Sequence, residues 1–595
     1  MLSPGTRCLY TDALMPPAGM ELDCGVATTY SLDMDTLLTI PLQLVFATAG
    51  NQRELIRDGV ALLSALREAT DKISIFCQRG GIHVPSRDHV LYPLLERMIY
   101  QAEAPKGGAF HPKVWLLRFT DPKKQHIRHR LMILSRNITD SSSWDVSLTL
   151  DGTPTDSARS QNEQLAELVE ALPKLADASI DKTRARSMEK LADEVRTTRW
   201  ELPDGYKSLE FHLTGLNGRK WQPPGCAAII VISPFLTEAA LRELYRKAPA
   251  GKRALLSTQD SLDGIDPSAL EYYSRIVTLH DDASVDNEEE TTPTSLHAKL
   301  YVYSRYYSTH IVLGSANATS PAIKSGVNVE LMAELKGRPH NIGEPMDILA
   351  PEKGLGDLLV DYTPGEKREE DEETRRVEDS LDAAQKALAS SQLSLRCSRE
   401  DDAYALELCS SEAIAFPDLD AAIAWPITLR EHTAVDASGL GPGSPLRFPD
   451  MSATSVTGLI AFDLNLQDCS RRFVLNLPLT NPPADREGAI IRTVVNNREG
   501  FIRYLMLMLN LESAQMSAGS SGGLFSWSSL GLHCGEDGSG LLEQLLTALA
   551  NSPETLLSID RLVRSIQKDS EAQDILPAGF MDMWETFREV ISTDA

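Results

Sequence analysis

The sequence predicts an α/β protein in which two similar halves form a pseudo-twofold core, followed by an α+β region. Each half is expected to be a mixed β-sheet flanked by helices. Short apolar, strand-like runs alternate with helical patterns before residue 350. The same order of strands, helices and polar motifs occurs twice in that part. After residue 394 the pattern changes to strand-like alternation and then to helical spacing from Arg492.

The first half covers residues 1–152. A helix-like run begins at Met34, and the segment Asn51–Thr70 carries apolar residues at helical spacing. Apolar runs predict buried strands at Leu42–Ala49 and Lys72–Gln78, and a further helix is expected at Tyr92–Tyr100. This alternation predicts a layered α/β unit.

A helical connector is expected over residues 153–205, with amphipathic helices at Gln161–Leu175 and Lys182–Arg196. The second half then covers residues 206–350. Its predicted elements are strands at Ala227–Ser233, Arg253–Ser257 and Arg275–Leu279, and a helix at Glu238–Lys247. The acidic segment Asp281–Thr292 is expected to be a solvated loop.

Residues 351–394 are predicted to be a charged linker, Thr363–Arg376, and a helix, Val377–Ser390. Residues 395–595 form the predicted α+β domain, a partner-docking or assembly module. Its strands are expected in Leu393–Leu408 and Leu459–Leu477, and its helices in Val494–Leu511, Leu541–Leu549, Pro553–Lys568 and Met581–Ile591. The Gly/Ser loop Ser517–Trp527 lacks the Gly-Lys-Ser/Thr ending of a phosphate-binding loop.

The composition excludes several classes of protein. With a net charge of −26, the chain is not a general nucleic-acid coat protein, although a locally basic cleft remains compatible. None of the eight cysteines forms a Cys-x-x-Cys pair, which argues against a zinc knuckle and suits a reducing cytoplasm. The N-terminus has no signal-peptide pattern, and no apolar run is long enough to span a bilayer.

The segment Leu296–Thr319 is the most informative stretch. His297 and Lys299 are two residues apart, so on a strand they point to the same face. A second strand, Thr309–Leu313, ends at Gly314, and the following turn would bring Ser315 and Asn317 to the same edge. An imidazole, an ammonium, a hydroxyl and an amide would then converge. This set is suited to binding a phosphate.

The same arrangement occurs in the first half. His111 and Lys113 precede two apolar strands, and Ser135 and Asn137 follow them. The His-to-Asn spacing is 26 residues here and 20 in the second copy, and the extra length lies in a polar hairpin. Each copy is followed by an acid, Asp145 in the first and Glu330 in the second.

These paired His-x-Lys and Ser-x-Asn motifs resemble the phospholipase D superfamily. That superfamily also has an aspartate five residues after the lysine, where this chain has Arg118 and Ser304. The departure is similar to the His-Lys-Asn motifs of tyrosyl-DNA phosphodiesterase and to the phospholipase D-like nucleases of bacterial anti-phage systems. The resemblance implies two repeats packed about one active site, and it implies that the first-repeat histidine, His111, is the nucleophile. The residues alone leave the two histidines equivalent.

The chemistry explains why these residue types are needed. Lys113, Lys299, Asn137 and Asn317 would hold the nonbridging oxygens of a phosphodiester, and Ser135 and Ser315 would add hydroxyl donors. One neutral histidine would attack phosphorus, and the other would protonate the leaving oxygen. Asp145 and Glu330 would each accept a hydrogen bond from a histidine ring. Two imidazoles need neither a metal nor a cofactor.

Other side chains are less telling. The basic hairpin KKQHIRHR, with His126 and His129, is either a solvated turn or a nucleic-acid contact. Arg136, inside the first Ser-x-Asn motif, could reach a phosphate, and the sequence leaves this open. Phe235 is expected to pack, and His310 is expected to be an outward-facing or core histidine.

The motifs therefore predict a phosphodiesterase that acts on nucleic acid, with DNA as the expected substrate. The resemblance implies that it is the nuclease of a bacterial anti-phage system. The alternatives are a repair phosphodiesterase that removes adducts from DNA ends, a non-catalytic nucleic-acid-binding scaffold, and a lipid phosphodiesterase. An ATPase or helicase is the expected protein partner. Homo-oligomerisation stays open, and neither a membrane nor a metal is expected to take part.

Overall fold

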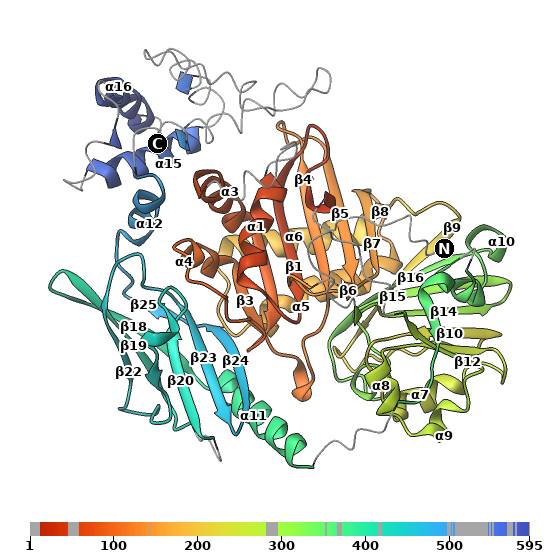
Figure 1. The fold of residues 1–595 in the computed structure, drawn as a ribbon. Helices are drawn as coiled ribbons and strands as arrows, with labels where there is room; N and C mark the ends of the chain where they lie inside the picture. Colours follow the sequence, from red (N-terminus) through yellow and green to blue (C-terminus); the bar gives the residue numbers. More distant parts are fainter. Residues whose placement is uncertain are drawn as a thin grey trace.

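The computed structural model describes residues 12–45, 59–141, 143–280, 295–351, 354–365, 372–414, 419–496, 501, 504–505, 545–546, 549, 553–567, 575–576 and 580–593. Within these ranges the chain forms two large mixed sheets, two smaller four-stranded sheets and one two-stranded sheet (Figure 1). The predicted α/β class is confirmed. The segments Asp281–Thr292 and Ser517–Trp527 and most of Val494–Leu511 and Leu541–Leu549 lie outside the described residues.

The first sheet has the strand order β3-β2-β1-β4-β5-β7-β8. Strands β1, β2 and β3 pair in parallel, and β4, β5, β7 and β8 continue the sheet in antiparallel fashion. The strands are β1 (Glu21–Thr29), β2 (Ile73–Gln78), β3 (Ile99–Ala102), β4 (Val114–Thr120), β5 (Ile127–Leu134), β7 (Ser147–Pro154) and β8 (Thr198–Trp200). Helices of this part are α1 (Met34–Val45), α3 (Gly59–Lys72), α4 (Tyr92–Leu95), α5 (Glu163–Leu175) and α6 (Lys182–Thr197).

The second sheet has the order β17-β12-β11-β10-β14-β15-β16-β9. Its strands are β9 (Tyr206–Thr214), β10 (Ala228–Ile232), β11 (Arg253–Leu256), β12 (Arg275–Leu279), β14 (Leu300–Arg305), β15 (Ser308–Gly314), β16 (Glu330–Gly337) and β17 (Leu359–Asp361). Its helices are α7 (Glu238–Tyr245), α8 (Gln259–Asp263), α9 (Pro267–Leu270) and α10 (Pro339–Ile342).

The two sheets repeat one topology. Parallel strands β10, β11 and β12 correspond to β1, β2 and β3, and antiparallel strands β14, β15 and β16 correspond to β4, β5 and β7. One hydrophobic core, which includes Leu116, Leu168 and Ile230, joins the inner faces of both sheets with helices α5 and α6. The internal repeat predicted from the sequence is thus present in the fold.

Two element predictions were wrong. The apolar run predicted as the strand Leu42–Ala49 continues helix α1 as far as Val45, because a short apolar run does not distinguish a buried helix from a buried strand. The predicted helix Tyr92–Tyr100 is helical only over Tyr92–Leu95 as α4, and Ile99 begins β3. Parallel pairing of β3 with β2 outweighs the local helical pattern there.

The sheets also extend beyond the predicted domain boundaries. Strand β8, within the predicted connector 153–205, pairs with β7 of the first sheet. Strand β17, within the predicted linker 351–394, pairs with β12 of the second sheet. Such short edge strands carry little pattern of their own, so only their pairing reveals them.

The C-terminal region begins with α11 (Glu372–Ser390) and two four-stranded sheets ordered β22-β19-β18-β25 and β21-β20-β23-β24. Their strands are β18 (Leu393–Glu400), β19 (Ala403–Ser410), β20 (Ala421–Pro426), β21 (Val435–Asp436), β22 (Leu446–Met451), β23 (Leu459–Leu466), β24 (Cys469–Asn476) and β25 (Leu479–Thr480). Helices α12 (Arg486–Val494), α15 (Pro553–Gln567) and α16 (Phe580–Thr593) follow.

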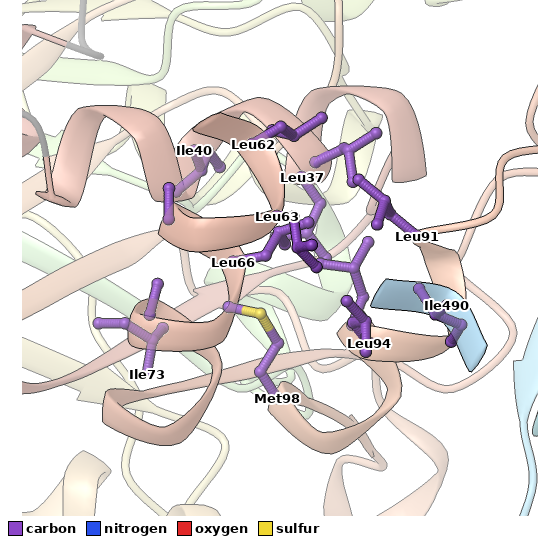
Figure 2. Close-up of a cluster of buried hydrophobic side chains, with 14 of the residues drawn as sticks. Leu37, Ile40, Leu62, Leu63, Leu66, Ile73, Leu91, Leu94, Met98 and Ile490 are labelled. Atoms are coloured by element: carbon purple, nitrogen blue, oxygen red, sulfur yellow. The ribbon is translucent and has the colours of Figure 1, made fainter. Parts of the chain in front are cut away.

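This region shares a hydrophobic core with the first repeat. Ile490 of α12 packs among Leu63 of α3 and Leu94 of α4 in one buried cluster (Figure 2). The backbone N–H of Val474 donates to the carbonyl of Ile82 at 2.8 Å. Burying this much apolar surface makes the C-terminal region part of the first repeat's packing. No helix in the described part of the chain is long and apolar enough to cross a membrane.

Candidate active site

The two repeats meet along short stretches of paired backbone. Strand β6 (Ser143–Trp144) of the first repeat pairs in parallel with β13 (Ser295–Leu296) of the second. On the other side, Phe110 and Val329 form an isolated parallel bridge. These pairings place each His-x-Lys motif against the acid that follows the motif of the other repeat.

Both histidine–acid pairs therefore cross between the repeats. His111 Nδ1 lies 2.8 Å from Oε2 of Glu330, and His297 Nδ1 lies 3.0 Å from Oδ1 of Asp145. The backbone N–H of each histidine also donates, at 2.9 Å, to the carbonyl of the residue just before that acid. The predicted roles of the two acids have this geometric basis, and neither half holds a complete site by itself.

The close approach of the repeats depends on Gly108. A Cβ at this position would lie 2.1 Å from the carbonyl oxygen of Val327, across the junction. Because the backbone of Gly108 has an ordinary φ of −72°, the substitution Gly108→Ala acts through this clash alone. We expect kcat/KM to fall by about 10²-fold, since a displacement of about 1 Å is enough to misalign such groups.

The matched control is Gly225→Ala, where an added Cβ would meet no atom within 4 Å. Steady-state assays of both variants, with a thermal melt of each, check this prediction. Full activity of a folded Gly108→Ala protein would show that the junction tolerates separation.

Lys113 and Lys299 are each 1% exposed. Lys113 Nζ lies 2.9 Å from His111 Nε2, and Lys299 Nζ donates to the carbonyl oxygens of His297 at 2.7 Å and Ser135 at 3.2 Å. Within the described residues, neither lysine forms an ion pair with a carboxylate. A buried ammonium without a carboxylate partner is costly, so this arrangement is suited to an anion.

Burial lowers the pKa of both histidines. Burial, with Lys113 beside the ring, lowers the pKa of His111 to about 4 even though Glu330 opposes the shift. Burial also lowers the pKa of His297, against its hydrogen bond to Asp145. Burial lowers the pKa of Lys299 to about 7 and that of Lys113 well below its ordinary value. Each lysine acts on both histidines, so the four groups form one site.

The two serines lie deeper than the sequence analysis placed them. Ser135 Oγ donates to Asp145 at 2.7 Å and accepts from the N–H of Val146 at 2.9 Å. Ser315 Oγ bonds the backbone of Leu331 through its carbonyl and its N–H. Both serines are fully buried, so they position the acid-bearing strands and do not face a phosphate.

The two asparagines sit at the ends of the same turns. Asn137 Oδ1 accepts from the backbone N–H of Tyr30 at 3.3 Å. Asn317 is 9% exposed, and its Oδ1 is a buried atom that has no hydrogen-bond partner among the described residues. Arg136, between Ser135 and Asn137, donates to the carbonyls of Thr139 and Ser141.

The hairpin histidines have different surroundings. His126 is exposed beside Asp121, whereas His129 is buried and contacts Glu194 and Thr198. His129 is thus a structural residue and cannot touch a nucleic acid.

Sequence reasoning missed one exposed aromatic side chain at the site, Tyr30, and assigned a second, Phe235, wrongly. Tyr30, 38% exposed, follows the central strand β1, and its ring lies edge-on to the ring of His111 at 5.2 Å between centroids. Phe235, 57% exposed, follows the central strand β10, and its predicted packing role is wrong. A signal for this exposure is present in the sequence, because each residue follows shortly after the end of a buried strand.

The two central strands end in the same kind of turn. A hydroxyl at the strand end donates to the carbonyl two residues later and accepts an N–H from the residue after the asparagine. The bonds are Thr29 Oγ1 to Ser31 at 2.7 Å and Ile138 N to Thr29 Oγ1 at 3.0 Å in the first repeat, and Ser233 Oγ to Phe235 at 2.7 Å and Ala318 N to Ser233 Oγ at 2.9 Å in the second. Tyr30 therefore lies beside Asn137, and the backbone of Phe235 belongs to the turn that contacts Ala318, the residue after Asn317.

The sequence matches no protein-family model, and no curated protein matches it. Among solved structures, the chain is similar to a yeast tyrosyl-DNA phosphodiesterase, with TM-score 0.34 and 10% identity over 56% of this chain and 86% of that one. It is also similar to phosphatidylserine synthase from Haemophilus influenzae Rd KW20, with TM-score 0.33 and 9% identity over 64% and 92%. The resemblance to the phospholipase D superfamily rests on the paired motifs at His111 and His297.

A third similar structure is polyphosphate kinase from Porphyromonas gingivalis, with TM-score 0.27 and 10% identity over 55% of this chain and 41% of that one. These TM-scores are low, so the case for the site rests on its own residues and contacts.

Proposed function

We propose that this phospholipase D-like chain is a metal-independent phosphodiesterase that hydrolyses nucleic acid through a phosphohistidine on His111. DNA is the expected substrate. The observation that carries the proposal is the convergence of two buried lysines without carboxylate partners on two histidines, each held by a carboxylate. A phosphodiester would supply the negatively charged partner for the two lysine ammonium groups. The histidines supply a nucleophile and an acid.

In the first step, His111 Nε2 attacks phosphorus. Its Nδ1–H donates to Glu330, and its Nε2 accepts from Lys113, so the lone pair is on the nitrogen that faces the lysine. The bond from phosphorus to the leaving oxygen breaks, and that oxygen takes a proton from Nε2 of His297. Lys113 and Lys299 hold the nonbridging oxygens as charge builds on them.

In the second step, water attacks the phosphohistidine. His297, now neutral, takes a proton from the water, the phosphorus–nitrogen bond breaks, and His111 is restored. Asp145 and Glu330 keep both rings in the required tautomer and orientation.

One further observation favours nucleic acid as the substrate. Tyr30 places an exposed aromatic ring beside His111 and Asn137, and every base offers a face on which such a ring stacks. The net charge of −26 repels polyanions in general, so a strand would bind only where the lysines are.

The anti-phage role is an analogy from the family resemblance. In that role the chain would act in the cytoplasm with an ATPase or helicase partner. A pull-down with the full chain as bait tests for such a partner.

The test of the function is an assay in EDTA with end-labelled single- and double-stranded DNA and RNA. We expect cutting by the native chain and by His340→Ala, an exposed histidine outside the site, and none by His111→Ala or His297→Ala. A 3′-phosphotyrosyl oligonucleotide and phosphatidylcholine separate the repair and lipid alternatives. A chain that binds DNA equally with and without both histidines, and cuts none of these substrates, would be a scaffold.

A further inference from the structure

A second cluster of polar side chains lies on the outer face of the second sheet. Glu210 and His212 are two residues apart on β9, so they point to the same face of that strand. Glu334 on β16 is the direct antiparallel partner of Glu210. Tyr303 on β14 and His310 on β15 reach Glu334 from the far side. None of these residues takes part in the proposed hydrolysis.

The two oxygens of Glu334 have different partners. His310 Nδ1 at 2.6 Å and Tyr303 OH at 2.7 Å both contact Oε1. His212 Nε2 lies 2.6 Å from Oε2, on the side where Glu210 stands. The ring of His310 stacks on that of Tyr303, with 4.7 Å between centroids and 10° between planes, which holds both donors in place.

Two carboxylates face each other directly at this point. Like charges on directly opposed residues of neighbouring strands destabilise a sheet. No lysine or arginine in the described part of the chain forms an ion pair with Glu210 or Glu334. The ligand atoms of Glu210, His212 and Glu334 all lie within 4.8 Å of one another. A cation between them would remove the repulsion.

We propose that Glu210, His212 and Glu334 bind one divalent transition-metal ion, with Zn²⁺ as the expected occupant. One imidazole and two carboxylates form a mixed nitrogen and oxygen set that zinc accepts, with water completing the coordination. Tyr303 and His310 orient the coordinating carboxylate, as outer hydrogen-bond partners do in metal sites. The side chains of Glu334 and His212 are 12% and 18% exposed, so the ion would be partly shielded from solvent.

The ion would have a structural role. It would tie the edge strand β9 to β16, the strand that begins at Glu330. Glu334 is four residues further along, about 13 Å from Glu330 at about 3.3 Å per residue. The ion is therefore too far away to touch the reacting phosphate, and the proposal is independent of the proposed function.

The test uses the full chain, stripped with a chelator and dialysed. Calorimetric titration with Zn²⁺ is expected to show one site per chain, with affinity lowered at least 10-fold in Glu210→Gln and in His212→Gln. Excess Zn²⁺ is expected to raise the midpoint of thermal unfolding by about 3 °C in the native chain only. Substitution with Co²⁺ would add a visible absorption band from the coordinated ion.

The control is Glu271→Gln, an exposed glutamate elsewhere in the second repeat, which should bind Zn²⁺ like the native chain. Glu210 is exposed, so its glutamine variant is expected to fold, and its melting curve in chelator checks this. The proposal fails if the native chain binds no stoichiometric ion. It also fails if the folded Glu210→Gln and His212→Gln variants bind Zn²⁺ as tightly as the native chain.

Discussion

His111→Ala is expected to lower kcat/KM by at least about 10⁴-fold for every phosphodiester, because it removes the proposed nucleophile. His297→Ala is expected to cost about 10²–10⁴-fold with DNA but far less with a nitrophenyl phosphodiester. A nitrophenolate leaves without a proton, so that substrate does not need the general acid. Parallel assays of both variants on both substrates measure the difference.

The structure supports this assignment through the state of His111. Burial holds its pKa at about 4, so the ring is neutral and nucleophilic across the neutral range. For the nitrophenyl ester, the activity of His297→Ala should fall as the pH drops through the pKa of His111. It should also fall as the pH rises through the pKa of Lys299, about 7, because a neutral amine no longer holds the phosphoryl oxygens. For DNA, the native activity should fall as the pH rises through the lowered pKa of His297, because its acid form is lost.

A direct check is to trap the intermediate. Labelled substrate should leave an acid-labile phosphoryl group on His297→Ala and none on His111→Ala. The reverse pattern, with His111→Ala rescued by the better leaving group, would assign the nucleophile to His297. Equal loss by both variants on both substrates would contradict the two-step mechanism.

Removal of the C-terminal region should unfold or aggregate the protein. A chain of residues 1–365 would lose the partners of α1, α3 and α4 in the shared core, which include Trp425, Ile490 and Trp584. Each buried side chain of this size contributes about 2 kcal/mol. The loss of about five such side chains from the shared core would therefore cost about 10 kcal/mol. That is similar to the whole stability of a typical domain.

The truncation would also leave buried polar groups without partners. The Glu96 carboxylate accepts from the N–H of Gly458 at 2.8 Å and pairs with Arg486 at 3.0 Å. Loss of these partners removes a salt bridge and hydrogen bonds that tie the C-terminal region to the first repeat. Gel filtration and circular dichroism of the truncated chain measure the result.

A milder variant keeps this prediction testable. Ile490→Ala should cost about 2–5 kcal/mol and lower a single, cooperative unfolding transition. Glu407→Ala, on the exposed face of β19, should leave that transition unchanged. If residues 1–365 fold alone and retain full activity, the C-terminal region is a separate module, as the sequence analysis predicted.

Much of the site was visible in the sequence because its motifs are local. His111 and Lys113 share a strand face by their spacing alone, and so do His297 and Lys299. The trailing acids Asp145 and Glu330 followed from the repeat. The internal repeat itself predicted two similar sheets, since one order of elements occurs twice.

The missed features depend on contacts between distant segments. The exposure of Tyr30 and Phe235 is not evident from the sequence. The residues next to them in the chain do not show that the preceding strand ends at the surface. Ser135 and Ser315 look like ligands, but burial turns their hydroxyls toward the acid-bearing strands.

The sequence by itself determined the α/β class, the doubled motif and the residue types of the site, because these depend on side-chain period and short spacing. Only the tertiary structure decided that each histidine is paired with the other repeat's acid, as His111 is with Glu330. It also decided that the C-terminal region belongs to the first repeat's core. Both facts depend on pairings across hundreds of residues, which local periodicity does not encode.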